Sequence, residues 1–82
     1  MTDSADFQDT AHLEGRYANV FKVGHNAFEF LLDFGQFYPE TGAPQHHTRI
    51  ITAPTYAKAL LQTLRESIEQ YERSFGIIAQ NE

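Results

Sequence analysis

The sequence has no cysteine, no tryptophan and a single methionine. Without cysteine the chain forms no disulfide and offers no thiolate to zinc, and this composition fits a reducing compartment, so we expect a cytoplasmic protein. No run approaches the roughly 18 apolar residues of a membrane span. No positively charged start precedes an apolar run, as a secretory signal would require. We therefore expect no membrane partner.

Basic residues are also few, since six Lys and Arg stand against eleven Asp and Glu, for a net charge of −5. The acidic surplus is concentrated at the start, where residues 1–14 carry Asp3, Asp6, Asp9 and Glu14 and no basic residue. The remainder is close to neutral. Proteins that bind nucleic acid need a basic surplus to neutralise phosphates. We therefore expect no nucleic-acid partner.

The length of 82 residues allows one domain at most. Residues 1–14 have only Phe7 and Leu13 as isolated large apolar residues, too few to fold alone. We interpret them as an acidic mobile tail, with the alternative that Phe7 anchors a short motif that orders on a partner. Residues 15–78 are predicted to form a single domain, and residues 79–82 a C-terminal tail.

Three stretches alternate with the period of two that is typical of strands. Residues 16–23 alternate around aromatic and β-branched positions, and the Gly-His-Asn at 24–26 predicts a turn. Residues 27–37 place four large apolar side chains on one face. Residues 38–45 contain two Pro and a Gly and predict a loop, and residues 46–53 form the third stretch. The apolar face of the second stretch comprises Phe28, Phe30, Leu32 and Phe34.

Residues 54–75 carry the signals of a long amphipathic helix. Pro54 suits the first helical turn, where its missing N–H costs nothing, and Gly76 is typical of the position after a helix end. Apolar residues recur at spacings of four and three, which places them on one side of the helix. This apolar stripe consists of Ala57, Leu61, Leu64, Ile68, Tyr71 and Phe75, and Leu60 widens it.

These elements predict an α+β fold, a three-stranded antiparallel meander packed on one long C-terminal helix in the order β-β-β-α. Such a sheet has two open edges, which invite pairing with another chain, and the helix stripe is close to a heptad seam. Small domains usually need a metal, a disulfide or a partner for stability. We therefore expect a homodimer or higher oligomer, or a complex with another protein. The predicted interface residues are Val20, Leu31, Leu61, Leu64, Ile68 and Tyr71.

The four histidines are the most obvious candidates for chemistry. His25 precedes the second strand and His46 and His47 follow it, about 30 Å away along a ten-residue strand. Within one subunit they therefore share no metal, and we expect neither a metal nor another cofactor. A weaker hypothesis places a small-ligand or anion site at the helix start, with His25, Thr52 and Thr55 as its residues.

The triplet Asp33-Phe34-Gly35 matches the magnesium-binding triplet of kinases, but the sequence lacks the Gly-rich loop, strand lysine and catalytic loop that accompany it. Asp33 is better interpreted as a polar residue on the less buried strand face. No catalytic residue is predicted within one chain. One alternative remains, an enzyme whose composite site combines His47 and Asp33 from different subunits of a dimer.

Several short motifs, spread over residues 14–78, resemble a family of short bacterial and archaeal proteins known only as a domain of unknown function. The resemblance implies a self-contained small domain and brings no activity or ligand residue with it. The leading hypothesis is a non-enzymatic homo-oligomeric interaction module. The motifs are Tyr17-Ala18-Asn19, Asp33-Phe34-Gly35, His47-Thr48-Arg49, and Tyr71-Glu72 before Phe75-Gly76.

Overall fold

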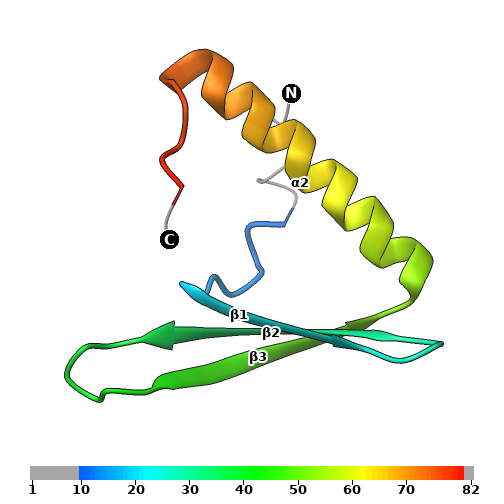
Figure 1. The fold of residues 1–82 in the computed structure, drawn as a ribbon, viewed down its shortest axis with the longest axis vertical. Helices are drawn as coiled ribbons and strands as arrows, with labels where there is room; N and C mark the ends of the chain where they lie inside the picture. Colours follow the sequence, from blue (N-terminus) through cyan, green and yellow to red (C-terminus); the bar gives the residue numbers. More distant parts are fainter. Residues whose placement is uncertain (1–9, 81–82) are drawn as a thin grey trace. The chain divides into compact units, whose positions relative to one another are not determined.

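The computed structural model describes residues 10–80 and confirms the predicted α+β order of three strands followed by one long helix (Figure 1). Residues 1–9 and 81–82 lie outside the described part, and with them Phe7 and most of the predicted tail. The elements are strand β1, Val20–His25; strand β2, Phe30–Phe37; strand β3, Pro44–Thr52; and helix α2, Pro54–Phe75.

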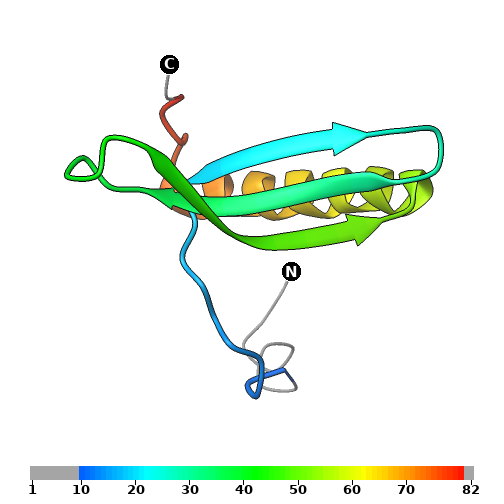
Figure 2. The same cartoon turned by 90° about the horizontal axis from the view of Figure 1, so that it is seen from below.

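The sheet has the order β1-β2-β3, and both neighbouring pairs are antiparallel, which confirms the meander (Figure 2). Because side chains alternate along a strand, residues that pair across the sheet share a face. One face, here called the aromatic face, contains Phe21, Val23, His25, Phe30, Leu32, Phe34, Thr48, Ile50 and Thr52. The other, the mixed face, contains Val20, Lys22, Leu31, Asp33, Arg49 and Ile51.

The first turn lies later than the sequence predicted. Gly24 belongs to β1, and the turn spans residues 26–29. The Asn26 side-chain oxygen accepts hydrogen bonds from the N–H groups of Phe28, at 2.7 Å, and Glu29, at 2.9 Å. The Asn26 N–H donates to the Glu29 carbonyl at 3.0 Å. The side chain of Asn26 thus stabilises the turn in place of a glycine with positive φ, as Asn often does.

The second turn is shorter than predicted, because β3 begins at Pro44 rather than at His46. Proline lacks an N–H, but it is tolerated as the first residue of an edge strand. Within the turn, Gly42 has a φ of 72°, and the Thr41 hydroxyl bonds with the Tyr38 and Ala43 carbonyls at 3.0 and 3.1 Å. These local hydrogen bonds stabilise the conformation of the loop that connects β2 to β3.

A β-bulge interrupts the pairing of β2 with β3. Phe34 pairs with Thr48 and Gly35 with His46, so that His47 is the extra residue. Gly35 is buried at this point, and a Cβ atom added to it would lie 2.3 Å from the Gln45 carbonyl oxygen. The close approach of the two backbones therefore requires glycine, as bulges and strand glycines often indicate.

Helix α2 has the predicted bounds. At its start the Ala53 carbonyl accepts from the N–H groups of Tyr56 and Ala57, at 3.0 and 2.9 Å. At its end Gly76 has a φ of 100°, and its N–H donates to the Glu72 carbonyl at 2.9 Å, as expected for a glycine that terminates a helix. No helix among residues 10–80 is both long enough and apolar enough to cross a membrane.

The chain divides into two compact units. One comprises Glu14–Ala57, with the whole sheet and the first turn of α2, and the other contains the remainder of α2 from Lys58 onward. Among the described residues, no apolar side chain is buried, so neither unit has a closed core of its own. That the helix packs on the sheet stays a prediction.

Candidate functional site

The charged residues of the mixed face form an ion pair across two strands. Asp33 of β2 lies opposite Arg49 of β3, and the guanidinium donates through Nε and Nη2 to the two carboxylate oxygens, both at 2.8 Å. The Asp33 side chain is only 13 % exposed, whereas that of Arg49 is 59 % exposed. This two-point geometry holds both side chains in one orientation. A shallow hollow of about 310 Å³ beside the pair is lined by Asp33, His46, His47, Thr48 and Arg49.

The hydrogen bonds from Arg49 lower the pKa of Asp33 below its ordinary value of 3.8. Desolvation opposes this effect, and the positive charges of Arg49, His46 and Lys22 add to it. A carboxyl group whose pKa falls on folding stabilises the protein above its unfolded pKa. That contribution is lost as the pH falls from about 4 through the lower folded value.

We therefore expect the Asp33→Asn variant to have a flatter dependence of stability on pH below about 4 than the native protein. The free energy of unfolding, measured with urea at several pH values between about 2 and 7, tests this expectation. Glu29→Gln serves as the control, because Glu29 is a carboxylate in the first turn that takes no part in this ion pair. Parallel curves for the native protein and Asp33→Asn would contradict the expectation.

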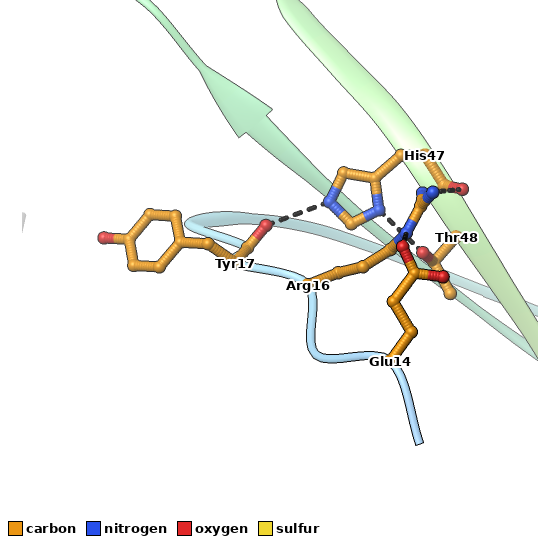
Figure 3. A network of polar contacts seen from close by, with 5 residues as sticks. All are labelled: Glu14, Arg16, Tyr17, His47 and Thr48. Atoms are coloured by element: carbon orange, nitrogen blue, oxygen red, sulfur yellow. Dashed lines mark hydrogen bonds and ion pairs between the residues drawn. The ribbon is translucent and has the colours of Figure 1, made fainter. Parts of the chain in front are cut away.

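The bulged residue His47 connects β3 to the segment that precedes β1. Its Nε2 lies 3.0 Å from the Tyr17 carbonyl oxygen, and its Nδ1 lies 2.6 Å from the Thr48 hydroxyl oxygen (Figure 3). Because a carbonyl oxygen only accepts, Nε2 carries the proton and donates. In the neutral ring Nδ1 then accepts from the Thr48 hydroxyl. The ring is thus oriented at both nitrogens.

Two further residues of the same segment extend this network. Arg16 donates through Nη1 to the His47 carbonyl at 3.4 Å, and its Nε lies 3.6 Å from a carboxylate oxygen of Glu14 (Figure 3). Further along, the Asn19 side-chain oxygen accepts from the Phe37 N–H at 2.9 Å, and the Asn19 N–H donates to the Gly35 carbonyl at 2.9 Å. The segment before β1 is therefore attached to both β2 and β3.

We expect His47→Ala to destabilise the protein by about 1–3 kcal/mol, because it removes two hydrogen bonds that each contribute about 0.5–1.5 kcal/mol net. Urea unfolding followed by circular dichroism measures the change. His46→Ala is the matched control, because the neighbouring His46 side chain is exposed and makes no hydrogen bond within residues 10–80. Equal stability of the two variants would contradict a structural role for His47.

The residues predicted for a small-ligand site lie on the sheet and at the helix start. His25 and Thr52 share the aromatic face, but Phe30 of the central strand pairs with both and lies between them. The His25 ring stacks on Phe30, with 5.4 Å between ring centroids. Thr55 follows in the first turn of α2.

The helix start offers few donors to an anion. Pro54 has no N–H, and the N–H groups of Tyr56 and Ala57 already donate to the Ala53 carbonyl. The first turn therefore lacks most of the free N–H groups on which anion binding at a helix N-terminus depends.

The histidines remain apart in the sheet, although less far than predicted. His25 pairs with Phe30 and His46 pairs with Gly35, five residues further along β2. At about 3.3 Å per residue this is about 17 Å rather than about 30 Å. The sequence placed the histidines at the two ends of a ten-residue strand, whereas β2 has eight residues and His46 lies within β3, paired with Gly35 before the end of β2.

The predicted interface residues are accessible in varying degree. Val20 and Leu31 are partly buried on the mixed face, while Leu64 of the helix stripe is 54 % exposed. A hollow of about 370 Å³ on the stripe is lined by Leu61, Leu64, Arg65, Ile68 and Glu69. Sequence reasoning missed Asn19 and Arg49, because their roles depend on which residues face them across the sheet.

The sequence matches, over residues 4–80, the family described as "Protein of unknown function (DUF3467)". The chain belongs to this family. The match confirms the predicted relation to a family of unknown function. No curated protein and no solved structure matches the chain.

Two of the motifs that indicated the family relationship meet in space. Asp33 pairs with Arg49, and Phe34 pairs with Thr48, so that Asp33-Phe34-Gly35 and His47-Thr48-Arg49 lie side by side at the bulge. In this member of the DUF3467 family, both motifs thus contribute to the bulge and to the bonds around it. Of their side chains, those of Asp33 and Arg49 join β2 to β3.

Proposed function

We propose that the protein is a small non-enzymatic interaction module that works as a homo-oligomer. The observation that carries this proposal is that neither compact unit buries an apolar side chain among the described residues. A chain with 41 % hydrophobic residues contains enough apolar side chains to form a core. To bury them, it needs a second apolar surface. A second copy supplies that surface.

The exposed side chains of the helix stripe indicate how much free energy burial at an interface contributes. Its large side chains are between 40 % and 76 % exposed, from Ile68 to Phe75. Full burial of such a side chain contributes about 1.5–3 kcal/mol, so covering a half-exposed one contributes about 1 kcal/mol. The whole stripe therefore represents several kcal/mol, which is a large part of the stability of a small domain.

If the helix packed on the sheet of the same chain, this contact would cover only two apolar surfaces, the helix stripe and the aromatic face. The sequence predicts that the stripe covers the aromatic face. The mixed face would then still present Val20, Leu31 and Ile51, of which Ile51 is 58 % exposed. These residues lie beside the Asp33–Arg49 pair, whose opposite charges cancel, so Lys22 is the one uncompensated charge among the residues that define the mixed face.

The side chains that we considered for a composite active site have structural partners. Asp33 is bound at both oxygens by Arg49, and both His47 ring nitrogens have partners within the same chain. A general base in such a site would need a free nitrogen or carboxylate oxygen within reach of its substrate. This arrangement favours interaction over catalysis.

The solution mass, measured by size-exclusion chromatography with light scattering over about a hundredfold range of concentration, tests the proposal. We expect a mass of two or more chains of 9.4 kDa. A monomer at every concentration would overturn it.

A further inference from the structure

Strand β3 is an edge strand whose outer side is open over a short, regular stretch. Among the described residues, Thr48–Thr52 make no backbone hydrogen bond other than those to β2. At one end the bulge at His47 breaks the strand, and the His47 carbonyl accepts from Arg16. At the other end α2 begins at Pro54. Five residues of regular edge remain between these limits.

The hydrogen bonds already made by β2 show which groups of β3 point outward. The carbonyls of Glu29 and Gly35 bond toward β1, with the N–H groups of Asn26 and Asn19. Backbone groups alternate in direction along a strand, so the odd-numbered residues of β2 face β1 and the even-numbered ones face β3. Their partners Thr48, Ile50 and Thr52 therefore bond inward to β2.

It follows that Arg49 and Ile51 direct their N–H and C=O groups to the open side of β3. Such a row of unpaired groups is a template for another strand unless a charge or a proline blocks it. The one Lys or Arg of this stretch, Arg49, is drawn back across the sheet to Asp33. It therefore does not protect the edge.

The opposite edge is better protected. Strand β1 has six residues and carries Lys22 near its middle, and its Gly24 weakens the strand further. In contrast, Thr48, Ile50, Ile51 and Thr52 of β3 are all β-branched, and Ile50 and Ile51 are 47 % and 58 % exposed. Pairing is therefore favoured at β3.

We propose that β3 pairs antiparallel with β3 of a second copy, with the two-fold axis at Ile50, to form a continuous six-stranded sheet. This inference rests on the proposed homo-oligomer and specifies its geometry. Arg49 of each chain exchanges both backbone hydrogen bonds with Ile51 of the other. Ile50 faces its own counterpart, and Thr48 faces Thr52 of the second copy, all on the aromatic face.

Charge and chain geometry select this register over its neighbours. An axis at Arg49 would place two arginines directly opposite each other, which destabilises a sheet. An axis at Ile51 would extend the pairing beyond Thr52 and bring Thr48 opposite Pro54, where the helix has begun. An axis at Thr48 would include the bulged His47 in the ladder. Only the axis at Ile50 uses all five open residues.

The ladder and the apolar surfaces have different roles in this dimer. Each backbone hydrogen bond of the ladder contributes little net free energy, because it replaces hydrogen bonds to water, so the ladder mainly sets the register. Edge pairing does not itself cover the aromatic faces, but it joins them across the two Ile50 side chains into one continuous surface, and covering that surface with the helix stripes of the two copies supplies most of the affinity.

A cysteine at position 50 tests the register, because the chain has no other cysteine. In Ile50→Cys the two thiols would sit at a non-hydrogen-bonded pair, where Cα atoms are about 4.5 Å apart and a disulfide fits. Ile51→Cys is the matched control. Its thiols would be offset by two residues, with Cα atoms more than about 7 Å apart, too far for a bridge.

Both variants are oxidised with glutathione and the covalent dimer is measured on a non-reducing gel, with circular dichroism as the check of folding. We expect the covalent fraction of Ile50→Cys to exceed that of Ile51→Cys by about tenfold or more. Equal fractions, or more dimer for Ile51→Cys, would overturn the register. If the unmodified protein is a monomer by light scattering, the proposed function fails as well; if it is an oligomer without this cross-linking preference, only the register fails.

Amide hydrogen exchange on the unmodified protein gives a second test that needs no variant. We expect the outward N–H groups of Arg49 and Ile51 to exchange at least about tenfold more slowly at high protein concentration than at low concentration. The N–H of Val23 on β1 is the reference, because it also points away from β2 and lies outside the proposed ladder. Exchange of Arg49 and Ile51 at a rate independent of concentration in an oligomeric sample would overturn the β3 pairing.

Discussion

We expect Gly35→Ala to destabilise the protein by about 3 kcal/mol, because overpacking of a close contact typically costs about 1–3 kcal/mol and this contact is unusually tight. The added methyl group would lie 2.3 Å from the Gln45 carbonyl oxygen and 2.8 Å from the His46 Cα atom. All the nearest atoms belong to backbone, so no side-chain rotation relieves the overlap. The strands would have to separate where the bulge joins them.

The matched control is Gly24→Ala, which adds a methyl group to the same sheet. Nothing lies within 4 Å of a Cβ atom at Gly24, so we expect a neutral effect or a gain of about 0.5 kcal/mol from the reduced freedom of the unfolded chain. Urea unfolding of both variants, followed by circular dichroism, measures the difference. A Gly35→Ala variant as stable as Gly24→Ala would show that the bulge register is wrong.

The second large effect is expected on the helix stripe. The double variant Leu64→Glu with Ile68→Glu should raise the dissociation constant of the oligomer at least about 100-fold. The two copies together lose four partly exposed aliphatic side chains from the interface, at about 1 kcal/mol each, and each 1.4 kcal/mol is a factor of ten. Glutamate favours helices, so α2 itself should persist.

Ala59→Glu with Thr63→Glu adds the same charge at the same spacing away from the stripe, and it should leave the mass unchanged. Light scattering and circular dichroism of both double variants separate three results. A folded monomer for the stripe variant alone supports the stripe as the interface between copies. Loss of folding in that variant alone would instead show that the stripe is covered within its own chain. Equal masses and equal folding would remove the stripe from the interface.

The sequence predicted the parts of the fold that depend on near neighbours along the chain. Helix α2 has its predicted bounds because Pro54, Gly76 and the spacing of the apolar residues all act within a few residues. The division of β2 into an apolar and a mixed face was also correct, since a strand turns its side chains alternately to either side whatever it pairs with.

The first turn shows the limit of local signals. Gly24, His25 and Asn26 all precede the second strand, and glycine and asparagine are both typical of turns. The structure uses Asn26 alone, because its side-chain oxygen is within reach of the N–H groups of Phe28 and Glu29. Gly24 instead remains paired with Leu31 in the strand. Two turn signals of similar strength, two residues apart, do not show which of them forms the turn.

The candidate site depended on contacts between distant parts of the chain. The pairing of Asp33 with Arg49 spans 16 residues, and that of His47 with Tyr17 spans 30. The first follows from the register of β2 with β3, which the bulge at His47 shifts by one residue. The second also depends on the attachment of the segment before β1 to β2 through Asn19. Composition does not reveal such a shift, because the bulge interrupts the alternation of β3 only at His47: Thr48 shares a face with Phe34, whereas His46 shares the opposite face with Gly35. The chain sequence alone therefore determined the elements and their faces, whereas the strand register decided which side chains became partners.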